Sequence, residues 1–387
     1  MYTWEITRRI AADIERLNEL RARLDTGTLP RRWAGRLRRE LEAGSTAAST
    51  GLGGVPVTVA EVRRILAGDR PPAVSDADIR LVEGYRDAMS YVLRRADDPG
   101  FTWQPELILG IHDRVLAGSY ALGAGRFRTG PVYLALTGEG RRVYEPPPAD
   151  EVPDLVRDLA DFAQTRSCDL PAPVLSALVH VRLAGVHPFS DGNGRTARVL
   201  ASLAMYRCGF TRAEFASLEE WWGAHREVYY AAFECLGPVW DPVANVTPFV
   251  EAHVNAQRLQ MEALSLREAA ERQLWQVLED IVTEDLSAPP RMADALYDAF
   301  FGREVTNRYY RGLADVSVAT ATNDLMRLEA SGLVRATGAG RSAAYTGTEA
   351  LVVAVAEAAN LGEVPISSPI DARRAWLVAR LAERAQR

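Results

Sequence analysis

The stretch that decides the fold of this 387-residue chain reads His187-Pro188-Phe189-Ser190-Asp191-Gly192-Asn193-Gly194-Arg195-Thr196-Ala197-Arg198. Apolar residues of helix-forming type precede it at 174–181, and a second set follows it at 199–204. Such periodic apolar runs predict a helix on each side. The glycine-bearing turn is therefore expected to lie at the N-terminus of the second helix.

This placement predicts a binding site for an anion. The free N–H groups and the positive end of a helix favour phosphate. Gly192 and Gly194 remove side-chain bulk, so the backbone can curl and approach the ligand closely. Arg195 and Arg198 lie three residues apart on one helix face and can clamp phosphate oxygens bidentately. We expect a phosphate group to bind at this turn.

Two other side chains of the stretch have the chemistry of a transfer reaction. Asp191 comes just before the turn and offers a hard oxygen ligand for Mg²⁺, which would bridge the carboxylate and the phosphates. His187 can take a proton near neutral pH. Taken singly, Asp191 is explained by helix capping and His187 by a structural hydrogen bond. Beside a phosphate site, they favour phosphoryl or nucleotidyl transfer to a hydroxyl.

The stretch matches the pattern H-x-F-x-[D/E]-G-N-G-R-x-x-R, and on these residues the sequence resembles the Fic family (filamentation induced by cyclic AMP). The resemblance runs from about residue 40 to 255. It implies a mostly α fold, with a Fic helical core and a β-hairpin flap, and a protein AMP transferase that uses ATP. The related Doc proteins, which phosphorylate, have Ala and Lys where Gly192 and Gly194 stand here. The two glycines favour adenylylation.

The resemblance implies a role for each motif residue. His187 would deprotonate a target Tyr, Thr or Ser hydroxyl, which attacks the α-phosphate and releases pyrophosphate. Asp191 would hold Mg²⁺, and Phe189 would point into the core. The implied ATP-binding residues are Gly192, Asn193, Gly194, Arg195, Arg198, Tyr229 and Tyr230. In that set the residues at 192–194 line the anion hole, the arginines bind the β- and γ-phosphates, and the tyrosines flank the adenine.

The chain departs from the family at an inhibitory position. Many Fic proteins carry a helix reading [S/T]-x-x-x-E-[G/N], whose glutamate pairs with the second motif arginine. Within residues 45–54, Ser49 and Gly54 fit this frame, but Gly53 stands where the glutamate would be. We therefore expect Arg198 to be free and the enzyme to be constitutively active, with a loose glycine-rich turn. The residues leave open whether this glycine is native or replaces a glutamate.

A hairpin is expected at 130–146. Two β-prone runs, 132–136 and 142–144, flank a glycine-bearing turn. In the family this flap docks the target by strand addition, here through Val132, Tyr133 and Leu134. An ordinary surface hairpin is the alternative.

The rest of the chain predicts further domains. We expect an N-terminal helical segment at 1–74, the Fic core at 75–267, a winged helix-turn-helix at 268–350 and terminal helices at 351–387. Across 303–345 the net charge is weakly positive, so the sequence does not decide whether this domain contacts DNA or protein. The groove-facing candidates are Thr320, Thr322, Asn323 and Arg327.

The composition bounds the remaining function classes. The net charge of −6 argues against a polycation that coats nucleic acid. Cys168, Cys208 and Cys235 are too few for a disulfide framework, and no segment has the length of a membrane span, so we expect a cytoplasmic protein. We also expect a homo-oligomer. The four remaining histidines are interpreted as structural: His112, His180, His225 and His253. Self-modification, a DNA-binding regulator with a nucleotide-sensing core, and a Doc-like phosphotransferase remain alternatives.

Overall fold

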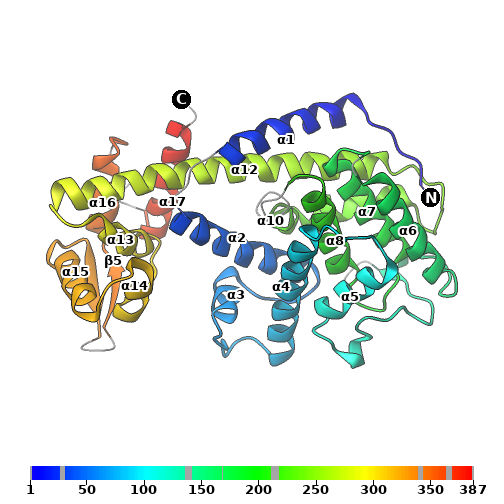
Figure 1. The fold of residues 1–387 in the computed structure, drawn as a ribbon, viewed down its shortest axis with the longest axis horizontal. Helices are drawn as coiled ribbons and strands as arrows, with labels where there is room; N and C mark the ends of the chain where they lie inside the picture. The colour runs from blue at the N-terminus through cyan, green and yellow to red at the C-terminus, as the bar shows by residue number, and fades with distance from the viewer. Residues whose placement is uncertain are drawn as a thin grey trace. The chain divides into compact units, whose positions relative to one another are not determined.

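The computed structural model describes residues 2–26, 31–135, 142–167, 169–210, 218–338, 343–362 and 368–385. These residues are mostly helical, with two small sheets, as predicted (Figure 1). The chain divides into two compact units, one of residues 1–28 and 33–262 and one of residues 29–32 and 263–387. In the described ranges, no helix combines the length and the apolar character needed to cross a bilayer.

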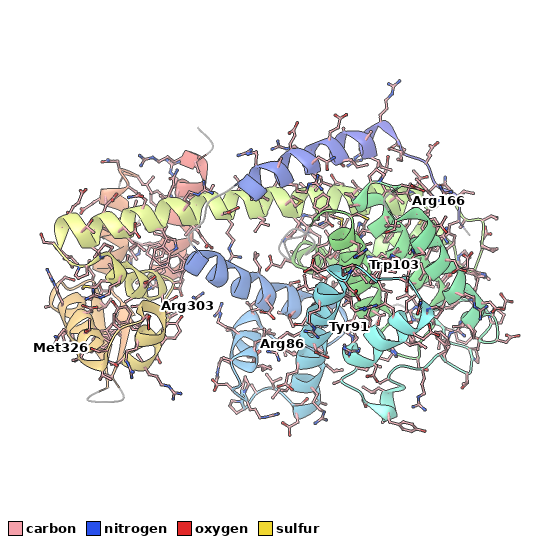
Figure 2. The ribbon with its side chains drawn as sticks, viewed as in Figure 1. Arg86, Tyr91, Trp103, Arg166, Arg303 and Met326 are labelled. Carbon is pink, nitrogen blue, oxygen red and sulfur yellow. The ribbon has the colours of Figure 1, made fainter. Side chains whose placement is uncertain are left out.

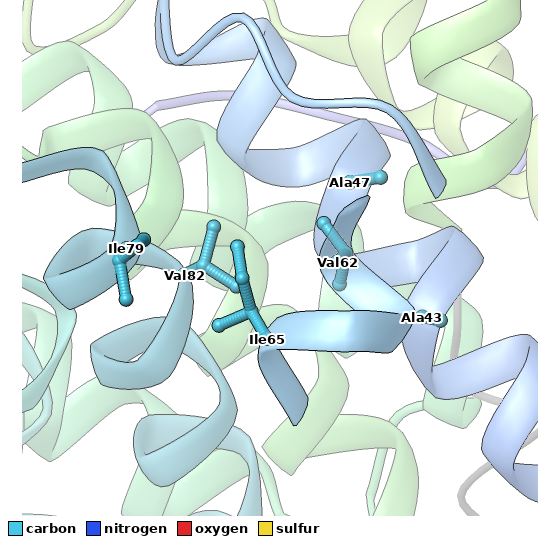
Figure 3. Packing of buried hydrophobic residues seen from close by; sticks show 6 residues of the cluster. All are labelled: Ala43, Ala47, Val62, Ile65, Ile79 and Val82. Atoms are coloured by element: carbon cyan, nitrogen blue, oxygen red, sulfur yellow. The ribbon is translucent and has the colours of Figure 1, made fainter. Parts of the chain in front are cut away.

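The first unit begins with three helices: α1 (Arg8–Thr26), α2 (Arg31–Leu52) and α3 (Val59–Leu66). The stretch at 45–54, which the sequence predicted to resemble an inhibitory helix with a glycine-rich turn, is helical as far as Leu52, and a turn follows at Gly53 and Gly54. Burial stabilises this part of the helix: Ala43 and Ala47 pack into a cluster with α3 and the following helix (Figure 3). The cluster consists of Ala43, Ala47, Val62, Ile65, Ile79 and Val82.

The helix that follows is α4 (Asp76–Ala96), so this cluster joins residues on both sides of the proposed boundary at 74/75. A capping box begins α3, where the Thr58 hydroxyl accepts from the Glu61 N–H at 3.2 Å and the Glu61 carboxylate accepts from the Thr58 N–H at 2.8 Å. Such reciprocal bonds satisfy two of the orphan donors at a helix start.

The centre of the first unit is a pair of helices, α7 (Ala172–Val186) and α8 (Asn193–Arg207), which pack on each other. Apolar residues surround α7 on all sides, and nearly all of them are buried, as expected of a central helix. Around the pair lie α4, α5 (Pro105–Val115) and α6 (Val152–Arg166), of which α6 packs on α7 and the other two on α8.

The remaining elements of the first unit are short, apart from a long helix that begins in it. They are η1 (Tyr120–Leu122), α10 (Glu219–Ala224), α11 (Arg226–Ala231), η2 (Ala232–Leu236) and the start of α12 (Thr247–Asp280). The division between the two units, and the proposed boundary at 267/268, both fall within α12.

A small hairpin interrupts the helices. Strand β1 (Leu134–Ala135) pairs antiparallel with β2 (Arg142–Tyr144), and Leu134 lies opposite Tyr144. Of the predicted flap residues, Val132 and Tyr133 precede the strand, and Leu134 begins it. The predicted turn at 137–140 lies outside the described residues.

The second unit holds the rest of α12 and the C-terminal elements. Helix α13 (Ala293–Phe300) precedes β3 (Val305–Thr306), α14 (Asn307–Ala314), α15 (Val318–Ala330), β4 (Val334–Thr337) and β5 (Ala344–Gly347), with the sheet order β3-β5-β4. The other elements are the π-turn η3 (Ile281–Asp285), η4 (Pro290–Met292), α16 (Glu349–Ala358) and α17 (Ile370–Ala385). Met326 extends outward from α15 and is 56% exposed (Figure 2).

Candidate active site

The turn between α7 and α8 is held by its own side chains. The Asn193 amide oxygen accepts from the Phe189 N–H at 2.9 Å, and its NH₂ donates to the Phe189 carbonyl at 2.8 Å. The Phe189 ring is fully buried. These two bonds hold the Asn193 amide against the Phe189 backbone, and the backbone N–H of Asn193 lies at the start of α8.

His187 lies at the end of α7 in a strained, left-handed conformation, with a φ of 49°. Its Nδ1 lies 3.2 Å from the Ala184 carbonyl oxygen, which can only accept, so Nδ1 carries the proton and Nε2 is left as a base. The side chain is half-buried, and burial lowers the pKa of His187 to about 4. The imidazole is therefore neutral at physiological pH and able to take a proton.

The start of α8 presents N–H groups and an arginine. Gly192 caps the helix with a φ of 79°, a conformation that favours glycine, and the first N–H groups of any helix have no acceptor in it. Arg195 is buried (3% exposed), and its Nη1 has no hydrogen-bond partner among the described residues. Buried polar groups are nearly always paired, so the vacant Nη1 points to an anion as the missing partner.

Asp191 combines an exposed carboxylate with contacts at the turn. Its side chain is 53% exposed, Oδ1 accepts from the Gly192 N–H at 2.6 Å, and both oxygens lie 3.3 Å from Arg195 Nη2. No group of three or more metal-ligating side chains occurs in the part of the chain that the structure describes. A single carboxylate fits Mg²⁺ that also binds substrate phosphates, since this ion keeps several waters and needs few protein ligands.

His112, which the sequence had indicated only as structural, supports the turn from α5. Its Nδ1 accepts from the Gly125 N–H at 3.1 Å, and its Nε2 therefore donates to the Asp191 carbonyl at 2.9 Å. The ring stacks on Phe189 with centroids 3.6 Å apart, and burial lowers the pKa of His112 to about 4. His112 lies far from the motif along the chain, so no spacing signal could have shown this contact.

These features lie within one segment that has known relatives. Residues 102–205 match the Fic/DOC family. The matched segment contains α5, the β1–β2 hairpin, α6, α7 and most of α8, and therefore the whole turn with His187 and Arg195.

Curated relatives of this Fic/DOC segment are named protein adenylyltransferases. The protein adenylyltransferase fic-1 of Caenorhabditis elegans is 39% identical over 117 residues, which are 28% of this chain and 22% of that protein. The protein adenylyltransferase Fic of Nematostella vectensis is 30% identical over 140 residues, 36% of this chain and 31% of that protein. The matches therefore span less than a third of the length of these relatives.

Two solved structures share the fold. A Fic family protein from Desulfovibrio desulfuricans G20 has a TM-score of 0.58 at 23% identity, over 90% of this chain and 98% of that one. A structure of Fic-1 from C. elegans has a TM-score of 0.53 at 23% identity, over 68% of this chain and 73% of that one. At this level of identity the likeness concerns the fold alone.

Helix α2, which lies outside the Fic/DOC segment, contacts Arg198, the second arginine of the motif. Arg198 donates from Nε to the Ser49 hydroxyl and from Nη2 to the Ser49 carbonyl, both at 2.8 Å, and from Nη1 to the Tyr229 hydroxyl at 3.0 Å. Arg198 is 4% exposed and Ser49 is fully buried. The expectation that Arg198 is free is therefore wrong: the helix without the glutamate still holds the arginine through Ser49.

Gly53 stands directly beside the first motif arginine. A Cβ atom placed on it would lie 3.2 Å from Arg195 Nε, and its φ is outside the left-handed region. The next residue, Gly54, ends α2 with a φ of 88°, with a bond from the Val55 N–H to the Thr50 carbonyl. Glycine favours the left-handed conformation that follows a helix in this way, which explains why the last position of the inhibitory frame is a glycine.

The two tyrosines proposed beside the adenine have different surroundings. Tyr229 is buried, and its hydroxyl lies 3.0 Å from Arg198 Nη1 and 3.2 Å from His180 Nε2. Tyr230 is 55% exposed and donates to the Leu52 carbonyl at the end of α2, at 3.1 Å. Tyr230 thus bonds to α2 directly, whereas Tyr229 bonds to Arg198, which α2 also contacts through Ser49. The contact of either tyrosine with adenine stays a prediction.

Proposed function

We propose that this protein is an adenylyltransferase that moves AMP from ATP to a hydroxyl group of a target protein. The observation that carries the proposal is the position of a neutral imidazole, with its Nε2 unprotonated, in the turn that precedes the start of α8 at Asn193, where Nη1 of the buried Arg195 has no hydrogen-bond partner among the described residues. A base and an anion site at this spacing are what nucleotidyl transfer to a hydroxyl needs. The names of the curated relatives support the same activity.

In the proposed reaction, His187 Nε2 removes the proton of the target hydroxyl. The hydroxyl oxygen then bonds to the α-phosphorus, the bond from that phosphorus to the bridging oxygen breaks, and pyrophosphate leaves. The N–H groups of Asn193 and Gly194 and the Arg195 guanidinium would neutralise the charge that develops on the phosphates. The Gly192 N–H, which donates to Asp191 Oδ1 in the structure, would join them if that bond is released. Asp191 would hold Mg²⁺, which supplies further positive charge when bound.

The proposal is tested with ATP carrying the label at either end. The purified chain is incubated with magnesium and with ATP labelled at the α- or the γ-phosphate, alone and with added cell extract. Label from the α-phosphate on protein, with an AMP-sized mass increase where the chain modifies itself, supports the proposal. Label from the γ-phosphate alone would indicate a Doc-like phosphotransferase, and no label from either would favour a nucleotide sensor.

The pH dependence of the reaction follows from the surroundings of His187. A general base works only when unprotonated, so the transfer rate should rise with pH through about 4 and then stay level. We expect this profile in short assays, with circular dichroism recorded at each pH, because burial also lowers the pKa of His253, to about 3, so that acid destabilises the folded chain. An acid limb centred near the ordinary histidine pKa would contradict it.

Helix α2 is proposed to act as a restraint on Arg198 through Ser49. The glycine at position 53 means that α2 itself brings no carboxylate to Arg195, whose carboxylate partner is Asp191. On this proposal the enzyme is active without release of a glutamate. Arg198 becomes available to the γ-phosphate when it exchanges Ser49 for the nucleotide.

The variant Ser49→Ala tests this restraint. It removes the acceptor of Arg198 Nε, so ATP affinity should rise about threefold to tenfold, while the unpaired donor lowers the free energy of unfolding by about 1–3 kcal/mol. Calorimetric titration with Mg-ATP and denaturant unfolding measure the two effects. The matched control is Ser45→Ala, one turn earlier in α2, whose hydroxyl donates to Glu219. Unchanged or weaker ATP binding by Ser49→Ala would rule the restraint out.

The second unit is proposed to be a winged helix-turn-helix that contacts protein, with a second copy of the chain as the proposed partner. The exposed face of α15 carries the apolar residues Val318 and Met326. Arg327 Nη2 donates within the unit, to the Leu286 carbonyl at 2.6 Å and the Ser287 carbonyl at 3.0 Å. Of the other groove candidates, Thr322 and Asn323 are exposed and Thr320 is half-buried. The apolar residues on this face favour self-association of the chain over binding to DNA. We also propose a cytoplasmic location.

A further inference from the structure

Arg128 is a buried cation that donates to three backbone carbonyls. Only 4% of the residue is exposed. Its Nε donates to the His187 carbonyl at 2.8 Å, its Nη1 to the Gly130 carbonyl at 3.1 Å, and its Nη2 to the Pro147 carbonyl at 2.5 Å. The backbone N–H of Arg128 also donates to the Pro188 carbonyl at 3.0 Å. Arg128 thus has its main contacts in backbone rather than in a carboxylate.

The three carbonyls belong to the end of α7 and to the two sides of the β1–β2 hairpin. One is that of the proposed base, His187. The other two lie on either side of the hairpin, Gly130 before β1 and Pro147 after β2. A second contact supports the same junction, because the Tyr144 hydroxyl of β2 donates to the Gly185 carbonyl near the end of α7 at 2.8 Å. Both ends of the hairpin are therefore tied to the end of the helix that carries the base.

We propose that Arg128 is a positioning residue, which sets the distance between the β1–β2 hairpin and the imidazole of His187. This inference rests on the proposed function, in which His187 takes the hydroxyl proton, and on the prediction that the hairpin docks the target segment by strand addition. The planar guanidinium has donors in a fixed fork, so three bonds to three carbonyls fix the geometry in a way that a lysine could not. A displacement of about 1 Å between reacting groups can reduce a rate about 100-fold.

Arg128 has a second effect on the base through its charge. The charged groups that act on the His187 imidazole are Arg128, which favours its neutral form, and Asp191, which favours its protonated form. The Arg128 guanidinium is the larger of these two influences on the pKa of His187. Removal of the charge should therefore move the acid limb of the rate profile to higher pH, whereas a lysine, which keeps a charge there, should leave it in place.

The test compares Arg128→Gln and Arg128→Lys with the wild-type chain. AMP transfer is measured with α-labelled ATP, ATP affinity by calorimetric titration, and the His187 pKa by nuclear magnetic resonance of the labelled imidazole. We expect both variants to transfer AMP about 10-fold to 100-fold more slowly, with ATP affinity within about twofold of wild type. Only Arg128→Gln should raise the His187 pKa.

The matched control is Arg207→Gln, at the far end of α8. Arg207 is also a partly buried arginine that donates to backbone carbonyls, from Nη1 to those of Ala96 at 2.6 Å and Asp98 at 3.1 Å. The variant Arg207→Gln should have a lower free energy of unfolding but the wild-type rate of AMP transfer. Wild-type transfer by both Arg128 variants would overturn the proposal, as would an equal loss of transfer in Arg207→Gln. If the wild-type chain itself transfers no AMP, the proposed function fails instead, and the His187 pKa of Arg128→Gln still tests the contact.

Discussion

Replacement of His187 by alanine is expected to reduce AMP transfer by about 10²-fold to 10⁴-fold, the range that a positioned general base contributes. The hydroxyl of a Ser, Thr or Tyr residue is a weak nucleophile until its proton is removed. His187 Nε2 is the group placed to do this, because the Nδ1 proton is held by the Ala184 carbonyl and the ring is neutral. The label from α-labelled ATP that appears on protein measures the loss.

ATP binding should survive this substitution. The proposed anion site consists of the start of α8 and Arg195, which do not depend on the imidazole. The affinity of His187→Ala for Mg-ATP should therefore stay within about threefold of wild type. The control is His225→Ala, which removes an exposed histidine on the same unit and should leave transfer unchanged. Transfer by His187→Ala at the wild-type rate would remove the imidazole from the mechanism.

The variant Gly53→Glu should reduce AMP transfer by about 10-fold to 100-fold, the loss expected when a hydrogen bond to a charged group of about 1.5–3 kcal/mol competes with the nucleotide. The new carboxylate would start from a Cβ that lies 3.2 Å from Arg195 Nε, close to the vacant Nη1. It would take the place proposed for a phosphate. The backbone at Gly53 accepts a side chain, because its φ is not left-handed.

The isosteric variant Gly53→Gln separates charge from bulk. It has nearly the same shape but no negative charge, so we expect it to retain most of the activity. Calorimetric titration with Mg-ATP should show weaker binding for Gly53→Glu alone, and salt should relieve part of its effect if the carboxylate pairs with Arg195. Equal inhibition by the two variants would show that bulk blocks the site, and an active Gly53→Glu chain would end the inhibitory interpretation of this position.

The structure changes the prediction about inhibition in one respect. The sequence led us to place an inhibitory glutamate against Arg198, and to expect Arg198 to be free in its absence. In the structure, position 53 faces Arg195, whereas Arg198 bonds with Ser49. The frame of residues was recognisable from the sequence, but the choice of arginine depends on how α2 lies against α8, which no local pattern encodes.

Local chemistry made the turn and its two helices predictable from the sequence. Runs of apolar residues of helix-forming type marked α7 and α8, and Gly192 provided the left-handed residue that the start of α8 uses. The antiparallel hairpin was predictable from its β-prone runs and intervening glycines. These features depend on residues that are close along the chain, so their interactions are visible in the order of the amino acids.

Contacts between distant residues were decided only by the tertiary structure. The His187 pKa depends on how much protein surrounds the ring, and the two bonds of Ser49 with Arg198 join residues far apart in the chain. The same holds for the three carbonyls that receive the Arg128 guanidinium. Desolvation and hydrogen bonding act through space, so they appear only after packing has brought these groups together. The sequence by itself determined the parts of a phosphate site, and the fold determined which charges are paired and which are left for a ligand.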